Sequence, residues 1–489
     1  MNTRASGLLY GLSHCREQIK IHHNNLKTRQ ALSLSSVFTA LELTSPGLTA
    51  LVLAALVSQG IQAAESPWRL NDALNLPEGF SLSGTHRSRF ENITENVRQG
   101  TSKNDQVFAF RTILNAEYRS GQFSTQLELM DSRQSGATRD SIIGNGVVNT
   151  LDILQATLNY SLNDNNNTRI KLGRFTADWG SRRLIARNRF RNTLNAFDGI
   201  EVCQQTASGN SYRYMATRPV RRLPDDRASL LDNDREADDS SRALSLYGIH
   251  ATLPNLFEAL TSEVYFYALR EQDTPSINTR DRNLDTLGFR FFSAPALRTF
   301  DFELESIFQD GKLRSNATTR NSKLDHRAFF QYAMLGYSFD MPSRLRLQLE
   351  LDYASGDNNP FDGDNERFDS LFGVTTFEFG PGGLYGVFSR SNLISPGLRL
   401  TGNPTSRINL MLSYRHFWLA ESRDSWGSTG LSSLSGDAGS YLGQHLESRI
   451  RWDIVPGNAR IEGGLILLNA KNLSDNNSEF VYAGVELTF

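Results

Sequence analysis

The chain ends with the nine residues Val481-Tyr-Ala-Gly-Val-Glu-Leu-Thr-Phe489, in which every second residue is apolar. A period of two places alternate side chains on opposite faces of a β-strand. An apolar face that runs to a terminal aromatic residue is typical of the last strand of a membrane barrel, whose outer face meets lipid. The edge strand of a soluble barrel would show the same alternation, so this stretch alone leaves that alternative open.

The alternation returns along the whole chain, most clearly in Arg344-Leu-Arg-Leu-Gln-Leu-Glu-Leu-Asp-Tyr353. Leucines and Tyr353 form one face of this segment, and charged or amide side chains form the other. A soluble sandwich would bury the leucines in a core, whereas a barrel in lipid would turn the charged row toward a water-filled lumen. Similar segments are found at 123–129, 154–162, 302–308, 408–414, 446–454 and 461–467.

Composition agrees with a membrane barrel. The chain has 489 residues, of which 39% are hydrophobic, and its net charge is −2. After the N-terminal region, no run approaches the ~20 apolar residues that a membrane helix needs. A near-neutral charge argues against a nucleic-acid partner, because such proteins carry a clustered basic excess.

The N-terminal region contains an apolar segment of signal-peptide length at Leu48–Val57, and small residues follow at Ala63 and Ala64. This order predicts a leader over 1–64 with a secretory signal peptide that is cut near Ala63 or Ala64. Because about 45 residues precede the apolar segment, either the signal is extended or translation starts downstream of Met1.

Short and long connections alternate between the expected strands. Short polar turns are expected at 119–121, 163–167, 341–343, 402–405 and 456–458, and long charged connections at 91–106, 133–150, 217–241, 271–283, 311–326, 355–370 and 421–442. This order predicts an all-β, up-and-down antiparallel transmembrane barrel with short periplasmic turns and long external loops. We expect a short extension over 65–79 and the barrel over 80–489, with about 18 strands, or about 20 if 371–390 forms a further hairpin. Barrels of this size leave an aqueous channel.

An arginine-rich stretch, 179–199, contains Arg182, Arg183, Arg187, Arg189 and Arg191. Guanidinium groups stay charged and bind carboxylates in a two-pronged manner, so in a pore they would line a path for an anionic polymer. A solvated external loop is the alternative.

An acidic stretch, 351–369, is a weak candidate for a calcium site through Asp357, Asp362 and Asp364. Hard cations prefer clustered oxygen ligands, but the spacing differs from that of an EF-hand loop. We therefore predict no metal and no cofactor.

Several short motifs resemble those of the alginate-export family of outer-membrane barrels, in the family's order over 107–489. They are Gly173-Arg174, Trp179-Gly180 with Arg183-Leu184, Phe197-Asp-Gly199, Tyr353-Ala-Ser-Gly-Asp357 with Arg367-Phe-Asp369, Ser391-Asn-Leu393 with Pro396, Tyr414-Arg415 with Trp418, and 443–447. The resemblance implies an 18-stranded barrel. It also implies diffusion of an acidic polysaccharide through an arginine-rich constriction.

Alternation predicts a lumen face of mixed charge. Its expected arginines are Arg344, Arg346, Arg407, Arg415, Arg449 and Arg451, and its expected carboxylates are Glu128, Glu303, Glu305, Glu350, Asp352, Glu447 and Asp453. We expect some of these arginines to pair with carboxylates and brace the barrel. The predicted solute-facing cations are these six arginines together with Arg182, Arg183, Arg187 and Arg189 of the arginine-rich stretch.

The sequence thus predicts an outer-membrane channel of a Gram-negative bacterium for diffusion or export of an anionic solute, such as the acidic polysaccharide alginate. A general or nutrient-uptake porin and a barrel plugged by its loops are the alternatives. Isolated histidines and the lack of a nucleophile motif favour a protein that is not an enzyme. Expected partners are outer-membrane lipid, lipopolysaccharide and the barrel-assembly machinery, which would recognise Val485, Leu487 and Phe489.

Overall fold

The computed structural model describes residues 67–162, 167–257, 259–318 and 323–489. Of these, Trp68–Phe489 belong to one compact unit. The predicted leader, 1–64, lies outside the described residues and stays a prediction. Within the described ranges, no helix is both long enough and apolar enough to cross a membrane.

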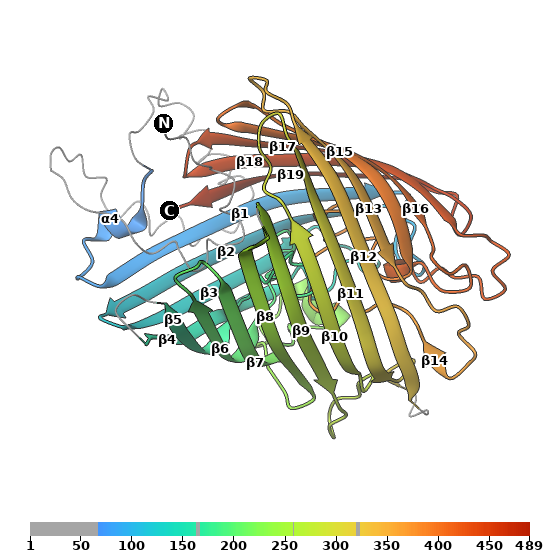
Figure 1. Ribbon diagram of the computed structural model, residues 1–489, viewed down its shortest axis with the longest axis horizontal. Coiled ribbons are helices and arrows are strands. Elements are labelled where there is room, and N and C mark those ends of the chain that lie inside the picture. The colour runs from blue at the N-terminus through green and yellow to red at the C-terminus, as the bar shows by residue number, and fades with distance from the viewer. Residues whose placement is uncertain (1–66, 163–166, 258, 319–322) are drawn as a thin grey trace. The chain divides into compact units, whose positions relative to one another are not determined.

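Eighteen antiparallel strands form a closed barrel (Figure 1). Each strand pairs with its neighbours in the sequence, and β1 also pairs with β19, which closes the ring. The strands are β1 (Phe80–Thr94), β2 (Asp105–Ser120), β3 (Phe123–Ser135), β4 (Asn149–Ser161), β5 (Thr168–Phe175), β6 (Phe197–Gln205), β7 (Ser211–Pro219), β8 (Leu244–Phe257), β9 (Leu260–Glu271), β10 (Asn283–Phe292), β11 (Phe300–Leu313), β12 (Leu324–Ser338), β13 (Arg346–Ala354), β15 (Leu393–Thr405), β16 (Ile408–Trp418), β17 (Tyr441–Val455), β18 (Ala459–Ala470) and β19 (Asn477–Thr488).

The remaining elements are short. β14 (Asp364–Asn365) pairs in parallel with β12 and stands outside the ring. Helix α4 (Leu70–Leu74) precedes β1, helix α5 (Arg227–Asp232) lies in the β7–β8 loop, and the 3₁₀ turn η2 (Gly427–Thr429) lies in the β16–β17 loop. Asp226 caps α5 by accepting hydrogen bonds from the amides of Ala228 and Ser229.

Long and short connections alternate around the ring, as predicted. Loops of ten residues or more follow β1, β3, β5, β7, β9, β11, β13 and β16, and turns of seven residues or fewer lie at the other end of the strands. The β18–β19 connection, 471–476, lies at the long-loop end but has only six residues. The predicted count of 18 strands is confirmed, and the alternative of 20 is wrong because 371–390 forms no hairpin and lies within the β13–β15 loop.

The faces of the strands are inverted relative to a soluble protein. On β13, the outward Leu349 is 52% exposed, whereas the inward Glu350 and Asp352 are 6% and 1% exposed. Because charged side chains are buried inside and leucines lie exposed outside, the outer surface suits lipid and the inner surface suits polar groups.

Outward aromatic side chains pair across neighbouring strands near both ends of the barrel. At the short-turn end the ring pairs are Phe80–Tyr118, Phe123–Tyr160 and Phe300–Tyr337. At the long-loop end they include Phe90–Phe108 and Phe329–Tyr353. Two aromatic belts on an apolar outer face are characteristic of barrels that span a membrane.

The terminal strand closes the barrel at the short-turn end. The amide of Phe489 donates to the carbonyl oxygen of Gly84 (3.0 Å). In return, the amide of Gly84 donates to the backbone oxygen of Phe489 (2.8 Å). A larger residue at position 84 would force the Phe489 ring to shift, since an added Cβ would lie 2.4 Å from that ring. The predicted assembly signal, Val485, Leu487 and Phe489, therefore lies at the closing seam between β19 and β1, and its recognition stays a prediction.

Several long loops fold inward and build an apolar core against the lumen wall. Buried residues of the loops, such as Trp179, Tyr385 and Phe388, pack with buried residues of the strands, such as Tyr267 and Phe417. The long-loop half of the lumen is therefore occupied by ordered protein, which positions the charged groups described next.

Candidate pore constriction

Two inward loops meet inside the barrel, the β5–β6 loop (176–196) and the β13–β15 loop (355–392). Their backbones run side by side: the amide of Phe372 donates to Leu184 O (2.9 Å), and the amide of Val374 donates to Arg182 O (3.1 Å). Gly373 allows this close approach, because a Cβ there would lie only 1.8 Å from the Arg183 carbonyl oxygen. The two loops therefore form one connected unit across the lumen.

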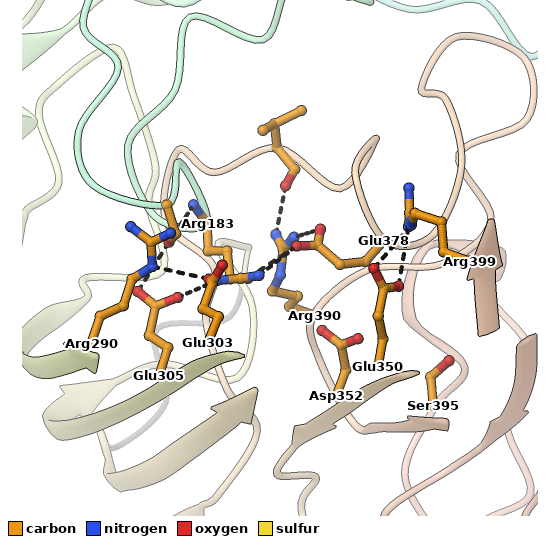
Figure 2. Close-up of polar contacts among 12 residues, drawn as sticks. Arg183, Arg290, Glu303, Glu305, Glu350, Asp352, Glu378, Arg390, Ser395 and Arg399 are labelled. Carbon is orange, nitrogen blue, oxygen red and sulfur yellow. Dashed lines mark hydrogen bonds and ion pairs between the residues drawn. The ribbon is translucent and has the colours of Figure 1, made fainter. Parts of the chain in front are cut away.

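Arg183 fixes this unit to the wall formed by β11. Its guanidinium makes ion pairs with Glu303 (2.6 Å) and Glu305 (2.5 Å) of β11, and with Glu378 of the β13–β15 loop (2.9 Å) (Figure 2). It also lies over the Tyr332 ring, 3.6 Å from the ring centre. Burial alone would lower the pKa of Arg183, but the three carboxylates hold it well above its ordinary value. Arg183 is thus a charged brace.

Arg390 continues the charged network within the β13–β15 loop. Fully buried, it donates to the carbonyl oxygen of Val374 (2.6 Å) and pairs with Glu378. Glu378 therefore joins Arg183 to Arg390, and Figure 2 shows its carboxylate reaching toward both arginines.

A second network lies on the neighbouring wall. Arg415 of β16, fully buried, pairs with Glu350 (2.6 Å) and Asp352 (2.9 Å) of β13, and Arg399 of β15 also pairs with Glu350 (2.9 Å). Gly397 makes room, because a Cβ there would lie 2.5 Å from Cγ of Arg415. The charges on this wall compensate one another. This agrees with the prediction that some arginines of a mixed lumen face pair with carboxylates.

The opposite wall holds the loops through backbone carbonyl groups. Arg87 of β1 and Arg111 of β2 lie directly opposite each other, and both donate to the carbonyl oxygens of Arg189 and Arg191 at 2.9–3.1 Å. Arg89 donates to the carbonyl oxygen of Phe190 (2.6 Å) and pairs with Glu91 (2.5 Å). This wall therefore carries more positive than negative charge.

Two further arginines share one neutral acceptor. Arg191 and Arg222 both donate to Oδ1 of Asn195, and no carboxylate among the described residues lies within 4.0 Å of either guanidinium. Burial first, and then the charge of Arg222, lower the pKa of Arg191 well below its ordinary value. Arg87 likewise has no ion pair in the described ranges. Arg87, Arg191 and Arg222 thus form no direct ion pair with a described residue, although the charge of Asp238 acts on Arg222.

Predicted site residues fall into three groups. Arg183, Arg187, Arg189, Arg346, Arg415 and Arg451 make ion pairs, with partners that include Glu128 for Arg187, Asp178 for Arg189, Asp301 for Arg346 and Glu462 for Arg451. Arg182 and Arg449 are partly buried and have no ion pair with a described residue, and Arg182 lies over the Phe377 ring. Arg344 and Arg407 are exposed in short turns, not on the lumen face of a strand as expected.

The reason for this difference is local. The backbone of Arg344 has a φ of +47°, which interrupts the alternation before β13 begins at Arg346. Arg407 lies in the turn that precedes Ile408, the first residue of β16. Contact of any of the ten arginines with a solute stays a prediction.

Asp178 shows how the arginine-rich loop is organised internally. Burial would raise the pKa of this carboxyl group, but Arg189 and a hydrogen bond from the Arg187 amide (2.8 Å) hold it below its usual range. An ionised Asp178 therefore holds the loop in shape and offsets part of its positive charge.

The weak metal candidates do not form a ligand group. Asp357 accepts hydrogen bonds from Asn359 and Asn365, and Asp362 accepts one from the Asp364 amide. Within the part of the chain that the structure describes, no three acidic, histidine or cysteine side chains are placed to hold a metal ion.

Sequence reasoning missed several of the arginines that hold the loops. Arg87, Arg89 and Glu91 alternate in His86-Arg-Ser-Arg-Phe-Glu91, and this period could have placed them on the lumen face. Arg222, Glu378 and Arg390 lie on irregular loops, where no periodic pattern marks an inward side chain.

Known proteins support the same architecture. The family profile described as "Alginate export" matches residues 79–466. The solved structure of OccK11 (OpdR) from Pseudomonas aeruginosa is 13% identical, covers 84% of this chain and 97% of its own, and superposes with a TM-score of 0.53. No curated protein sequence matches the chain.

Two other solved structures give similar values. OpdQ from Pseudomonas aeruginosa is 12% identical, with 84% of this chain and 99% of that chain covered and a TM-score of 0.57. A BenF-like porin from Pseudomonas fluorescens Pf-5 is 11% identical, with the same coverage and a TM-score of 0.56. These likenesses show the porin fold, and the profile match over most of the chain shows that it belongs to the alginate-export family of barrels.

Proposed function

We propose that the barrel is a passive channel of the bacterial outer membrane for an anionic solute, an acidic polysaccharide such as alginate. Family membership supports a channel, and the arginines without an ion pair support the sign of the charge it selects. The proposal includes no cofactor and no catalytic step.

The main support for anion selectivity is the cluster of Arg87, Arg191 and Arg222 around the β5–β6 loop. These guanidinium groups are bound by neutral oxygens and form no direct ion pair with a described residue, so their charge is cancelled only in part by more distant carboxylates such as Asp238. In a confined, poorly screened lumen, such charges raise the local concentration of anions. Because Arg191 and Arg222 are only partly buried, they are the ones available for direct contact with a solute.

Single-channel recording in a planar bilayer under a salt gradient tests this proposal. We expect anion selectivity in the wild-type protein, block by added uronate oligomers, and weaker selectivity and block in Arg191→Gln/Arg222→Gln. Arg270→Gln/Arg327→Gln is the matched control, since it removes the same charge from exposed positions paired with Asp285 and Asp310 near the long-loop ends of β9 and β12. Cation selectivity without block would contradict the proposal.

A nutrient-uptake porin is the second candidate. It is favoured by the connected loops, because a small solute can pass beside an ordered constriction, whereas a polymer needs a continuous wide path. Equal conductance block by small monocarboxylates and by uronate oligomers would favour this candidate. Under either function, the expected partners are outer-membrane lipid, lipopolysaccharide and the barrel-assembly machinery.

A further inference from the structure

An apolar groove runs over the outer face of the barrel near the short-turn end. Its volume is about 680 Å³, and its walls include the outward side chains Leu400, Leu410, Ile450, Leu465 and Val481. This volume lies within the roughly 300–1,000 Å³ of typical small-ligand sites.

Glycines on the outer face form part of its floor. Gly463 lies opposite Ile450 on β17 and Ala483 on β19, in a row that faces outward. A Cβ at Gly463 would meet its nearest neighbour at 3.4 Å, and one at Gly402 at 3.5 Å, both ordinary contact distances. Neither backbone has the positive φ that demands glycine. Glycine weakens a strand, and its use there often marks a bulge or a close approach by a ligand or another backbone. An irregularity in the strand pairing follows Gly402 and accounts for that glycine, which leaves Gly463 as the unexplained one.

A smaller groove on β6–β9 provides a contrast. It has a volume of about 300 Å³ and includes Gly248 in its lining. A Cβ at Gly248 would lie 3.0 Å from the Trp179 ring and 3.1 Å from the Tyr267 ring, both inside the barrel. Internal packing therefore explains Gly248, whereas nothing inside the barrel explains Gly463.

Two exposed arginines lie in the turns that border the larger groove. Arg344 stands between Ser343 and Leu345, which both line the groove, and Arg407 lies between the lining residues Pro404 and Leu410. The two turns are joined by a hydrogen bond from the Asn403 amide to Ser343 O (2.6 Å). Neither arginine has a carboxylate partner within 4.0 Å in the described ranges.

We propose that this groove binds an anionic phospholipid of the periplasmic leaflet. One acyl chain lies over Gly463 between Leu410 and Leu465, and the headgroup phosphate meets Arg344 and Arg407. The charge on the turns complements an anionic headgroup, and the apolar walls complement the chain. The site is separate from the pore, so it does not depend on the identity of the solute.

Native mass spectrometry of the full barrel in detergent, with equal amounts of phosphatidylglycerol and phosphatidylethanolamine, tests the site. We expect the wild-type barrel to prefer phosphatidylglycerol, and Arg344→Ala/Arg407→Ala to weaken this preference roughly 25-fold. The reason is that the attraction between one surface arginine and an anionic lipid changes the affinity by about five-fold. Arg298→Ala, which removes an exposed arginine paired with Asp340 at the same end, should change the preference little.

Filling the groove tests the acyl-chain contact separately. Gly463→Leu should reduce adducts of both lipids, whereas Ala216→Leu, which fills the smaller groove, should not. Equal adducts of the two lipids in the wild-type protein would overturn the proposal. An equal loss of lipid adducts in Gly463→Leu and Ala216→Leu would also overturn the proposal. If Gly463→Leu fails to fold, the double arginine variant alone decides.

Discussion

Arg183 in the β5–β6 loop and Glu305 on β11 form an ion pair of 2.5 Å in which both side chains are almost completely buried. The two residues are 122 positions apart in the sequence. Because Arg183 also pairs with Glu378 of the β13–β15 loop, this one guanidinium connects the barrel wall to both loops of the constriction. Loop position and barrel stability are therefore coupled.

Arg183→Ala should destabilise the folded barrel by about 3–5 kcal/mol, because it leaves Glu305 buried without a cation. Glu303 and Glu378 each lose one of their two cations and keep Arg290 and Arg390. Thermal unfolding followed by gel mobility would measure the loss. Arg189→Ala is the control: its partner is Asp178 and its side chain is half exposed, so the expected change is about 0–1 kcal/mol. Similar losses in both variants would show that Arg183 is not a brace. A surviving Arg183→Ala barrel should conduct more, since its loops are released.

The strand faces could be predicted from the sequence because alternation is a local signal. Leu349, Glu350 and Leu351 take the faces that the period of two assigns to them. The same signal fails at Arg344 and Arg407, since alternation carries no information beyond the end of a strand. The sequence therefore predicted the fold well and the exact lining of the lumen only in part.

Partners of the lumen arginines could not be predicted, because they depend on how irregular loops fold. Glu378 and Arg390 lie in a connection without regular strands, and their pairing requires the neighbouring β5–β6 loop. Composition suggested a mixed lumen but could not separate arginines with a direct ion pair, such as Arg415, from those without one to a described residue, such as Arg222.

Gly84→Ala should weaken the seam between β1 and β19, because its Cβ would collide with the Phe489 ring at 2.4 Å. We expect a loss of about 1–3 kcal/mol, typical of overpacking. Gly144→Ala, where a Cβ meets nothing within 4 Å, is the control and should be nearly neutral. In a double-mutant cycle, Phe489→Ala should relieve the effect of Gly84→Ala. Additive losses would mean that the collision is not the cause.

Asn458 joins three parts of the chain at the same end of the barrel. Its side chain accepts from the Trp68 amide (2.9 Å) and donates to Trp68 O and Thr488 O (both 2.7 Å). Asn458→Ala should therefore cost about 1–2 kcal/mol in urea unfolding. Asn403→Ala is the control. It removes one exposed side-chain hydrogen bond, with Asn409, and should lower the free energy of unfolding by less than Asn458→Ala does. If the two variants unfold at the same urea concentration, the Trp68 segment does not fasten the seam.

Asp238 in the β7–β8 loop gives a pH dependence with a defined sign. Burial, with a smaller contribution from Asp152, raises the pKa of Asp238 to about 6 from its ordinary 3.8. Between about pH 4 and pH 6 the folded protein therefore holds a proton that the unfolded chain has lost. Stability must fall as the pH rises through this window and recover as the pH drops.

The wild-type barrel should gain on the order of 1 kcal/mol between pH 7 and pH 5 from Asp238 alone. Other carboxyl groups titrate as well, so the informative quantity is the difference between wild type and Asp238→Asn in thermal unfolding at the two pH values. The Asn149 side chain and the Leu223 amide donate to the Asp238 carboxyl group, and the asparagine oxygen can keep only one of these bonds. The variant is therefore expected to be less stable at both pH values, while its pH dependence loses the Asp238 contribution. An unchanged pH dependence would show that Asp238 ionises normally in the folded loop.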